Sequence, residues 1–335
     1  MVPKAGPAIL GRWILTAGEG PFCLETTPCL LCGATEAEPL FHLKDFLLGL
    51  PGSFHLVRCA KCGLVYQNPR PTEAAIGAYY PPEYDPYVAS PWEAPNPLTR
   101  AILVHGLAKR WKLVAKWAPN RSGQRRILDV GCATGVFLAA GNAEWAKVGV
   151  ELSPKAAAFA REHFGLTVYE GMLEETPLEA ESFDVITMWD VLEHLHDPRR
   201  TLARVRHLLR PDGIFIFRVP NFDAWDARLA GRYWAGLDQP RHLFVPDEAA
   251  IARLLTITGF RAAERLCMSG TYGVLVLSWR FWLREHVGAA GRRRAAERAL
   301  NNPATRFALA PLLWAIDKVA RKGSLLTVVA RAVAR

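Results

Sequence analysis

The chain has 335 residues, of which half are hydrophobic and 22% are charged. This composition supports one large or two ordinary folded domains and excludes a mostly disordered protein. The net charge of +9 is unevenly distributed, because residues 1–95 carry −3 and residues 274–335 carry +9. The positive charge therefore belongs to the C-terminal segment and does not indicate nucleic-acid binding along the whole chain.

The sequence carries no recognisable secretion or membrane signal. It has no run of 18 or more apolar residues, and its first 20 residues lack a continuous apolar segment. Four of the seven cysteines form two Cys-x-x-Cys pairs, which in a reducing compartment favour metal binding over disulfides. These features predict a cytoplasmic protein.

In chain order, an irregular lead-in (residues 1–22) precedes a cysteine-bearing module over residues 23–75. Residues 76–97 are rich in Pro and Tyr, which predicts a linker without a regular helix or central strand. From residue 98 to Trp117 the apolar residues recur at helical spacing with basic residues between them. This helix is expected to lead into a main domain that covers residues 98–273.

The cysteine pairs form a matched set, Cys29-Leu-Leu-Cys32-Gly and Cys59-Ala-Lys-Cys62-Gly. The glycine after each second cysteine permits a tight turn, and four thiolates are the ligand set of a closed structural zinc site. The 26 residues between the pairs exceed the usual spacing, which predicts an inserted loop. We predict a zinc-ribbon-like module in which the metal supports folding. A ribbon that binds RNA is the alternative, although the acidic balance of this segment argues against it.

After Arg126, strand and helix signals alternate along the chain. Ser153 as N-cap and Pro154 as first residue mark the start of one of the helices. The alternation predicts a parallel sheet that is covered by helices on both faces. The expected strands are residues 127–130, 148–150, 167–169, 185–189 and 214–219, and the expected helices are residues 136–146, 154–164 and 199–209.

The segment Ile127-Leu-Asp-Val-Gly-Cys-Ala-Thr-Gly135 follows the first strand and opens the next helix. Gly131 permits a sharp turn with a ligand against the backbone, and Gly135 permits close packing of helix and strand. Glu151 lies 20 residues after Gly131, at the end of the second strand, where a carboxylate can accept both hydroxyls of a ribose. Alone, this pattern fits either a dinucleotide-dependent dehydrogenase or a methyl-donor enzyme.

Four further motifs separate these two classes: Val150-Glu-Leu-Ser153, Ser182-Phe-Asp-Val-Ile186, Asp190-Val-Leu-Glu-His194 and Leu209-Arg-Pro-Asp-Gly213. Together with the first, they resemble the class I S-adenosylmethionine-dependent methyltransferases over about residues 123–273 and 324–332. The whole chain is similar to a narrower group with a four-cysteine module, which includes sugar and quinone-pathway methyltransferases. The resemblance implies an α/β fold with a Rossmann-like seven-stranded sheet, an N-terminal zinc-ribbon-like module and a helical insertion before the last strand (324–335).

The resemblance also implies how S-adenosylmethionine is bound. Asp129 and Gly131 would hold the methionine end, Gly135 would pass close to the cofactor, and Glu151 would bind the ribose. Ala133 replaces a glycine that is often found in this turn, a small change that still admits close approach.

The remaining donor contacts follow from the same resemblance. Asp190 would lie near the sulfonium. Met172 stands where an acidic residue often contacts the adenine amino group, so adenine would be held by backbone and by Leu152, Met172 and Leu173.

Methyl transfer to oxygen or carbon requires removal of a proton, a task that suits a neutral histidine. His194, His196 and His242 are the candidate bases. His194 and His242 are favoured by their positions, and a supporting hydrogen-bonded role is the alternative for both. Glu193 beside His194 suggests a metal, but adjacent side chains on a helix are expected to diverge. Three more residues are expected either to line the pocket or to pack in the core: Asn221, Tyr233 and Trp234.

Residues 274–323 form a basic insertion with two apolar runs of about ten residues, too short to span a bilayer. Trp279, Trp282 and Trp314, with arginines nearby, suit a membrane interface. One alternative is a lid that rests on anionic lipid, peripheral at the inner membrane face. The other is a helical hairpin that packs on the domain or at a dimer contact, with its arginines in solvent.

We therefore expect an S-adenosylmethionine-dependent methyltransferase that acts on an oxygen or carbon of a small molecule, sugar-like or lipid-linked. S-adenosylmethionine and structural zinc are the expected cofactors. An RNA methyltransferase is an alternative, although no Asn-Pro-Pro-Tyr-type motif follows Trp189. A non-catalytic donor-binding protein is another.

Overall fold

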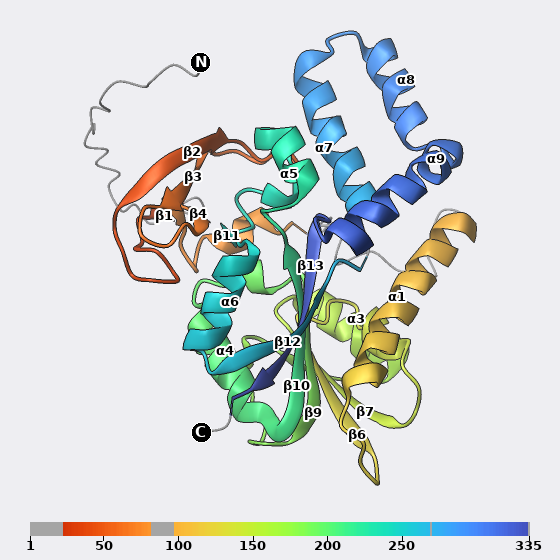
Figure 1. The fold of residues 1–335 in the computed structure, drawn as a ribbon. Helices are drawn as coiled ribbons and strands as arrows, with labels where there is room; N and C mark the ends of the chain where they lie inside the picture. The colour runs from red at the N-terminus through yellow and green to blue at the C-terminus, as the bar shows by residue number, and fades with distance from the viewer. Residues whose placement is uncertain (1–22, 82–96, 269, 334–335) are drawn as a thin grey trace.

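The computed structural model of the protein describes residues 23–81, 97–268 and 270–333. The predicted lead-in (1–22) and most of the predicted linker (82–96) lie outside the described residues. Within them, the chain forms a large sheet with helices on both sides, a smaller sheet near the N-terminus, and a group of helices close to the C-terminus (Figure 1).

The large sheet has seven strands in the order β12-β13-β10-β9-β6-β7-β8. Neighbouring strands from β10 to β8 are parallel, and β13 runs antiparallel to both β10 and β12. The predicted α/β fold with a Rossmann-like seven-stranded sheet is thus confirmed. The strands are β6 (Arg125–Val130), β7 (Trp145–Glu151), β8 (Thr167–Glu170), β9 (Phe183–Trp189), β10 (Leu209–Pro220), β12 (Phe260–Leu266) and β13 (Leu325–Ala332).

Helices cover both faces of this sheet, as the alternating pattern predicted. Successive residues of β6 point to opposite faces: Ile127 packs in one apolar cluster with Leu113 of α1, and Leu128 packs in another with Leu202 of α4. Figure 1 shows α1 and α3 on one side of the sheet and α4 and α6 on the other. The helices are α1 (Pro97–Trp117), α2 (Val136–Ala139), α3 (Pro154–Phe164), α4 (Pro198–Leu208), α5 (Trp225–Ala230) and α6 (Glu248–Ile257), with short 3₁₀ turns η4 (Leu173–Glu175), η5 (Leu192–His194), η6 (Gly231–Tyr233) and η7 (Ala235–Leu237).

Local signals set some helix boundaries correctly and one incorrectly. The Ser153 hydroxyl accepts a hydrogen bond from the Ala156 N–H and starts α3, as predicted. The helix predicted over residues 136–146 is wrong, because α2 ends at Ala139 and β7 begins at Trp145. Glycine and asparagine at positions 141 and 142 are weak helix formers, and the Trp145 ring packs edge-on against Trp111, 5.8 Å away.

The four-cysteine module is built into the main body of the protein. Its sheet has the order β11-β4-β3-β2, and β11 (Phe244–Val245) comes from the segment after β10. Leu31 and Tyr66 of the module lie in the same apolar cluster as Leu128 of the large sheet. The other elements of the module are β1 (Leu24–Glu25), β2 (Ala37–Leu43), β3 (Phe54–Cys59), β4 (Val65–Gln67), β5 (Arg70–Pro71) and η1 (Ile76–Tyr79).

The predicted insertion before the last strand is helical. It contains three α-helices and a π-helical turn, which is more than the two-helix hairpin of one alternative: α7 (Thr271–His286), α8 (Ala290–Leu300), α9 (Pro303–Trp314) and η8 (Ala315–Ala320). Among the helices in the described part of the chain, none has both the length and the hydropathy needed to cross a membrane.

Candidate functional site

A cavity of about 1080 Å³ opens at the carboxyl ends of β6, β7 and β9. The chain continues from β6 to β7 on one side and returns to β9 on the other, so the cavity lies where the strand order reverses. Ligands of open α/β sheets bind at such switch points. Residues of α1 and of η1 also line the cavity, so it is enclosed by the main sheet, the leading helix and the four-cysteine module.

The turn after β6 approaches the cavity closely with its backbone. Gly131 has a φ of 70°, and a Cβ there would lie 2.5 Å from Cγ2 of Val191. Ala133 also adopts a left-handed conformation (φ 48°) and presents its N–H to Glu151. Gly135, with a φ of 76°, would place a Cβ 2.8 Å from Cβ of Ala160, as expected for close helix packing. A side chain at position 131 or 135 would therefore clash with its neighbours.

Glu151 is held at the end of β7 by two hydrogen bonds and can accept more. One carboxylate oxygen accepts the Ala133 N–H and the other accepts the Ser153 N–H, each at 2.8 Å. Burial outweighs these bonds and raises the pKa of the Glu151 carboxyl. Each oxygen can accept a further hydrogen bond, and Glu151 lines the cavity, so its carboxylate fits the two hydroxyls of a ribose.

Asp129 and Arg110 also line the cavity, and they belong with Glu151 to its donor side, the part formed by the residues expected to bind the methyl donor. Asp129 is buried, accepts a hydrogen bond of 2.6 Å from the Thr187 hydroxyl, and has its pKa raised to about 7 by burial. Within the described part of the chain, the Arg110 guanidinium forms no hydrogen bond or ion pair, and it lies over the Trp189 ring at 4.8 Å. Burial, and then the nearby Arg218, lower the pKa of Arg110 to about 9. A desolvated cation next to a carboxyl that can lose its proton fits the carboxylate and amino groups of a methionine.

The three residues expected around adenine all line the cavity. Leu173 is buried, whereas the Leu152 side chain is 60% exposed and Met172 is partly buried. All three side chains are apolar, and their contact with adenine stays a prediction.

Asp190 follows β9 in a left-handed conformation, with a φ of 60°. Arg218 of β10 donates two hydrogen bonds to its carboxylate, one of 2.7 Å. Burial opposes ionisation of Asp190, but Arg218 outweighs it and holds the pKa of this carboxyl below its usual value. An ionised Asp190, paired with Arg218, therefore borders the cavity together with the two histidines.

His194 and His242 both line the cavity, and their ring centroids are 4.7 Å apart. Nδ1 of His242 lies 2.9 Å from the Gly236 carbonyl oxygen. A carbonyl only accepts, so Nδ1 carries the hydrogen and Nε2 has the free lone pair. Burial lowers the pKa of His242 and lowers that of His194 to about 3, so both rings are neutral at pH 7.

Glu193 is brought to the same place, contrary to expectation. Its donor atoms and those of His194 and His242 all lie within 4.8 Å of one another, at the short turn η5. Both carboxylate oxygens of Glu193 are buried without a hydrogen-bond partner, and burial raises the pKa of this carboxyl well above its usual value. This group therefore also meets the distance requirement for one divalent ion.

The three residues expected either to line the pocket or to pack in the core do not line the cavity. Trp234 is buried and donates a hydrogen bond to Asp226, and Asn221 is buried and donates one to the Gly323 carbonyl. The Tyr233 hydroxyl bonds to Glu285. Sequence reasoning missed Arg110, since one basic residue among several on a helix gives no signal of its own. It also missed Tyr80, whose hydroxyl lies 2.7 Å from Nδ1 of His194.

The four cysteines cluster as predicted. Cys29 and Cys62 sulfurs lie 3.5 Å apart, as do those of Cys32 and Cys59, and all four lie within 4.8 Å of one another. Tetrahedral zinc with bonds of about 2.3 Å requires sulfur separations of about 3.8 Å, which this cluster matches. Burial opposes ionisation of Cys59, but nearby N–H groups outweigh it and lower the pKa of this thiol to about 7. The donor set and spacing fit zinc.

Comparison with known proteins agrees with this geometry. Residues 104–264 match the model of a methyltransferase domain family. The chain is 31% identical over 185 residues to a ubiquinone biosynthesis O-methyltransferase of Histophilus somni, covering 51% of this chain and 77% of that protein. A second such enzyme, from Aromatoleum aromaticum, is 32% identical over 170 residues, or 46% and 72% of the two chains.

Among solved structures, an S-adenosylmethionine-dependent methyltransferase from Mesorhizobium loti covers 68% of this chain and 99% of its own, at 20% identity and a TM-score of 0.44. The family match and the curated relatives establish that this chain belongs to the S-adenosylmethionine-dependent methyltransferases.

Proposed function

We propose that the enzyme transfers a methyl group from S-adenosylmethionine to an oxygen or carbon of a small molecule, sugar-like or lipid-linked, with His242 as the general base. The observation that carries this proposal is the neutral His242 ring, which lines the cavity and whose Nδ1 is held by the Gly236 carbonyl, so that Nε2 has the lone pair. Bound S-adenosylmethionine supplies an activated methyl group, so the protein has only to align the acceptor and remove its proton.

Each residue on the donor side binds a different part of S-adenosylmethionine. Glu151 receives the ribose, while Leu152, Met172 and Leu173 enclose the adenine and Gly135 allows close approach of the turn. Asp129 and Gly131 bind the amino end of the methionine, and Arg110 binds its carboxylate. Asp190 then lies beside the positive sulfur.

Proton removal falls to His242 because of its surroundings. Its Nδ1–H is held by the Gly236 carbonyl, so Nε2 accepts the proton, and Asp238 lies 4.0 Å from Nε2 to stabilise the resulting charge. Burial raises the pKa of the Glu193 carboxyl well above its usual value, which favours its neutral form over a charge beside the ring. His194 supports this arrangement through its edge-on contact with the His242 ring.

The acceptor class is inferred from the cavity and from the relatives. The cavity lining also includes Ile76 of η1 and Ile102, Leu103 and Leu107 of α1, which suits an apolar or lipid-linked acceptor. The relatives are named for O-methylation in ubiquinone biosynthesis, which supports an oxygen nucleophile. Zinc in the cysteine cluster would be structural, because four thiolates leave no open coordination position.

Contact with an anionic membrane is a further part of this proposal. The side chains of Phe307 and Trp314 on α9 are 84% and 61% exposed, and Trp279 and Trp282 on α7 are also exposed. These helices lie in the segment that carries the +9 charge. If the surface binds lipid, Phe307→Ser with Trp314→Ser will reduce sedimentation with phosphatidylglycerol vesicles at low salt. No sedimentation of the native enzyme would exclude this contact.

The base is tested by His242→Gln, which keeps the size of the side chain but removes the basic nitrogen. Methyl transfer from labelled S-adenosylmethionine is measured against sugar nucleotides, quinone precursors and RNA. The expected result is a turnover at least about 100-fold lower on the accepted small molecule, with unchanged donor affinity. The matched control is His207→Gln, at an exposed position on α4. Full turnover by His242→Gln would remove His242 as the base, and transfer to RNA alone would overturn the acceptor class.

A further inference from the structure

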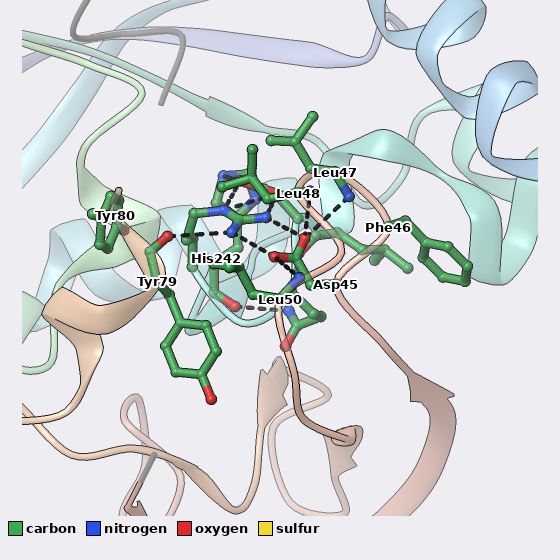
Figure 2. Close-up of polar contacts among 12 residues, drawn as sticks. Asp45, Phe46, Leu47, Leu48, Leu50, Tyr79, Tyr80 and His242 are labelled. Atoms are coloured by element: carbon green, nitrogen blue, oxygen red, sulfur yellow. Dashed lines mark hydrogen bonds and ion pairs between the residues drawn. The ribbon is translucent and has the colours of Figure 1, made fainter. Parts of the chain in front are cut away.

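A buried ion pair joins the four-cysteine module to the segment that carries His242. Asp45 lies in the loop between β2 and β3, and Arg241 lies 196 residues further along the chain. Two guanidinium nitrogens of Arg241 donate to the two oxygens of Asp45, at 3.0 and 2.8 Å, and both side chains are fully buried. Figure 2 shows these contacts between Asp45 and the residues around His242.

Each partner of this pair is itself held in place. The Asp45 carboxylate accepts the backbone N–H groups of Leu47 and Leu48 at 3.0 Å, which fixes it within its own loop. Arg241 also donates to Asp238, at 2.7 Å, and to the Tyr79 carbonyl oxygen, at 3.3 Å. The guanidinium thus links three separate segments with a defined geometry.

His242 is the next residue, and it is anchored on both sides. Before it, the Asp238 carbonyl accepts the N–H groups of both Arg241 and His242, closing a turn in which Asp238 has a φ of 31°. After it, the Leu243 carbonyl accepts the Gln67 N–H of the module at 2.8 Å. The His242 ring therefore sits on a turn that is attached to the module at each end.

We propose that Asp45 is a positioning residue for the reaction: through Arg241, the four-cysteine module holds the turn that aims Nε2 of His242 at the acceptor. This proposal rests on the proposed role of His242 as the base. Buried ion pairs add little net stability over apolar packing, so the pair is better explained by the geometry that it specifies. The module also contributes Glu73, Ile76 and Tyr80 to the cavity wall, and is thus part of the acceptor site.

Asp45→Asn breaks the link selectively. The remaining amide oxygen can still accept the Leu47 and Leu48 N–H groups, but the amide nitrogen meets an N–H of Arg241, donor against donor. In the full-length, zinc-loaded protein labelled with ¹⁵N-histidine, we expect the native His242 signal to show a single Nδ1–H tautomer. In Asp45→Asn, the signal should shift toward a mixture of tautomers. This measurement requires no acceptor.

Kinetics on the accepted small molecule give the second readout. Asp45→Asn should lower kcat at least tenfold while the Kd of S-adenosylmethionine changes less than twofold. In the His242→Gln background, the same substitution should cost less than twofold, because both changes act on one group. Asp212→Asn, at an exposed aspartate paired with Arg121 on the surface, is the matched control and should change neither readout.

An unchanged His242 tautomer in Asp45→Asn would overturn the proposal. A double variant whose loss in kcat equals the product of the losses of Asp45→Asn and His242→Gln would also overturn it. Elemental analysis for zinc and a thermal melt show whether the module has stayed folded, and Asp45→Glu, which keeps the charge, replaces Asp45→Asn if it has not. Full turnover by His242→Gln alone would reject His242 as the base. It would not reject the positioning of His242 by Asp45 and Arg241, which the tautomer measurement tests separately.

Discussion

Arg110 provides a direct test of how the donor is bound, because its charge is poorly compensated in the free enzyme. Its surroundings lower its pKa to about 9. One pKa unit corresponds to about 1.4 kcal/mol, so this lowering of the Arg110 pKa means that the site disfavours the charged guanidinium by about 5 kcal/mol. An anion that binds beside Arg110 recovers part of this free energy.

A hydrogen bond to a charged group contributes about 1.5–3 kcal/mol, which corresponds to about 10- to 150-fold in affinity. Arg110→Met keeps the length of the side chain and removes the charge. We therefore expect it to weaken S-adenosylmethionine binding by about 10- to 100-fold. Because it also removes a desolvated cation, it should raise the melting temperature of the free enzyme.

Calorimetric titration with two ligands isolates the contact. S-adenosylmethionine carries the methionine carboxylate, whereas methylthioadenosine retains the adenosine and lacks that carboxylate. Arg110→Met should weaken the first and leave the second within twofold of the native enzyme. Equal losses for both ligands, or no loss for either, would refute the assignment of Arg110 to the carboxylate.

Three further predictions follow from the same site. Gly131→Ala should weaken S-adenosylmethionine binding at least about tenfold in calorimetry, since left-handed φ costs about 1–2 kcal/mol and the new Cβ meets Val191. Adding Val191→Ala should restore part of the lost affinity. Native affinity in Gly131→Ala would contradict the close approach of this backbone. Asp129 must lose its proton to accept an amino group, so with a pKa of about 7 affinity should rise about tenfold from pH 6 to pH 8. Asp129→Asn should abolish that rise, and a rise that survives would assign it to another group. Cys59→Ser should abolish stoichiometric zinc in elemental analysis and lower the melting temperature; unchanged stability would argue against a structural metal.

The sequence was sufficient for the features that depend on local chemistry. The Asp129–Gly135 turn, the Ser153 cap and the paired cysteines each follow from residue types at short spacing, and the structure places them as predicted. The seven-stranded sheet follows from alternating strands and helices. These features depend on backbone geometry that a few neighbouring residues determine.

Contacts between distant segments were not accessible in this way. Arg241 and Asp45 are 196 residues apart, and no periodicity marks either as buried, because a charged residue in a loop normally lies in solvent. The closeness of Glu193 to His194 and His242 was mispredicted for a related reason. The donor atoms of all three lie within 4.8 Å of one another, and His242 comes from a distant segment of the chain.

The same long-range contacts change the meaning of the module boundary. The sequence divides the chain after the second cysteine pair, but β11 pairs with β4 and the two parts share one apolar cluster. The segment that carries His242 also supplies a strand of the module, so it cannot move independently of the module. Because Arg241 and Leu243 flank His242 with bonds to the module, loss of the module's fold would also displace the proposed base. The cysteine cluster therefore lies outside the cavity but in the same structural unit as the proposed base.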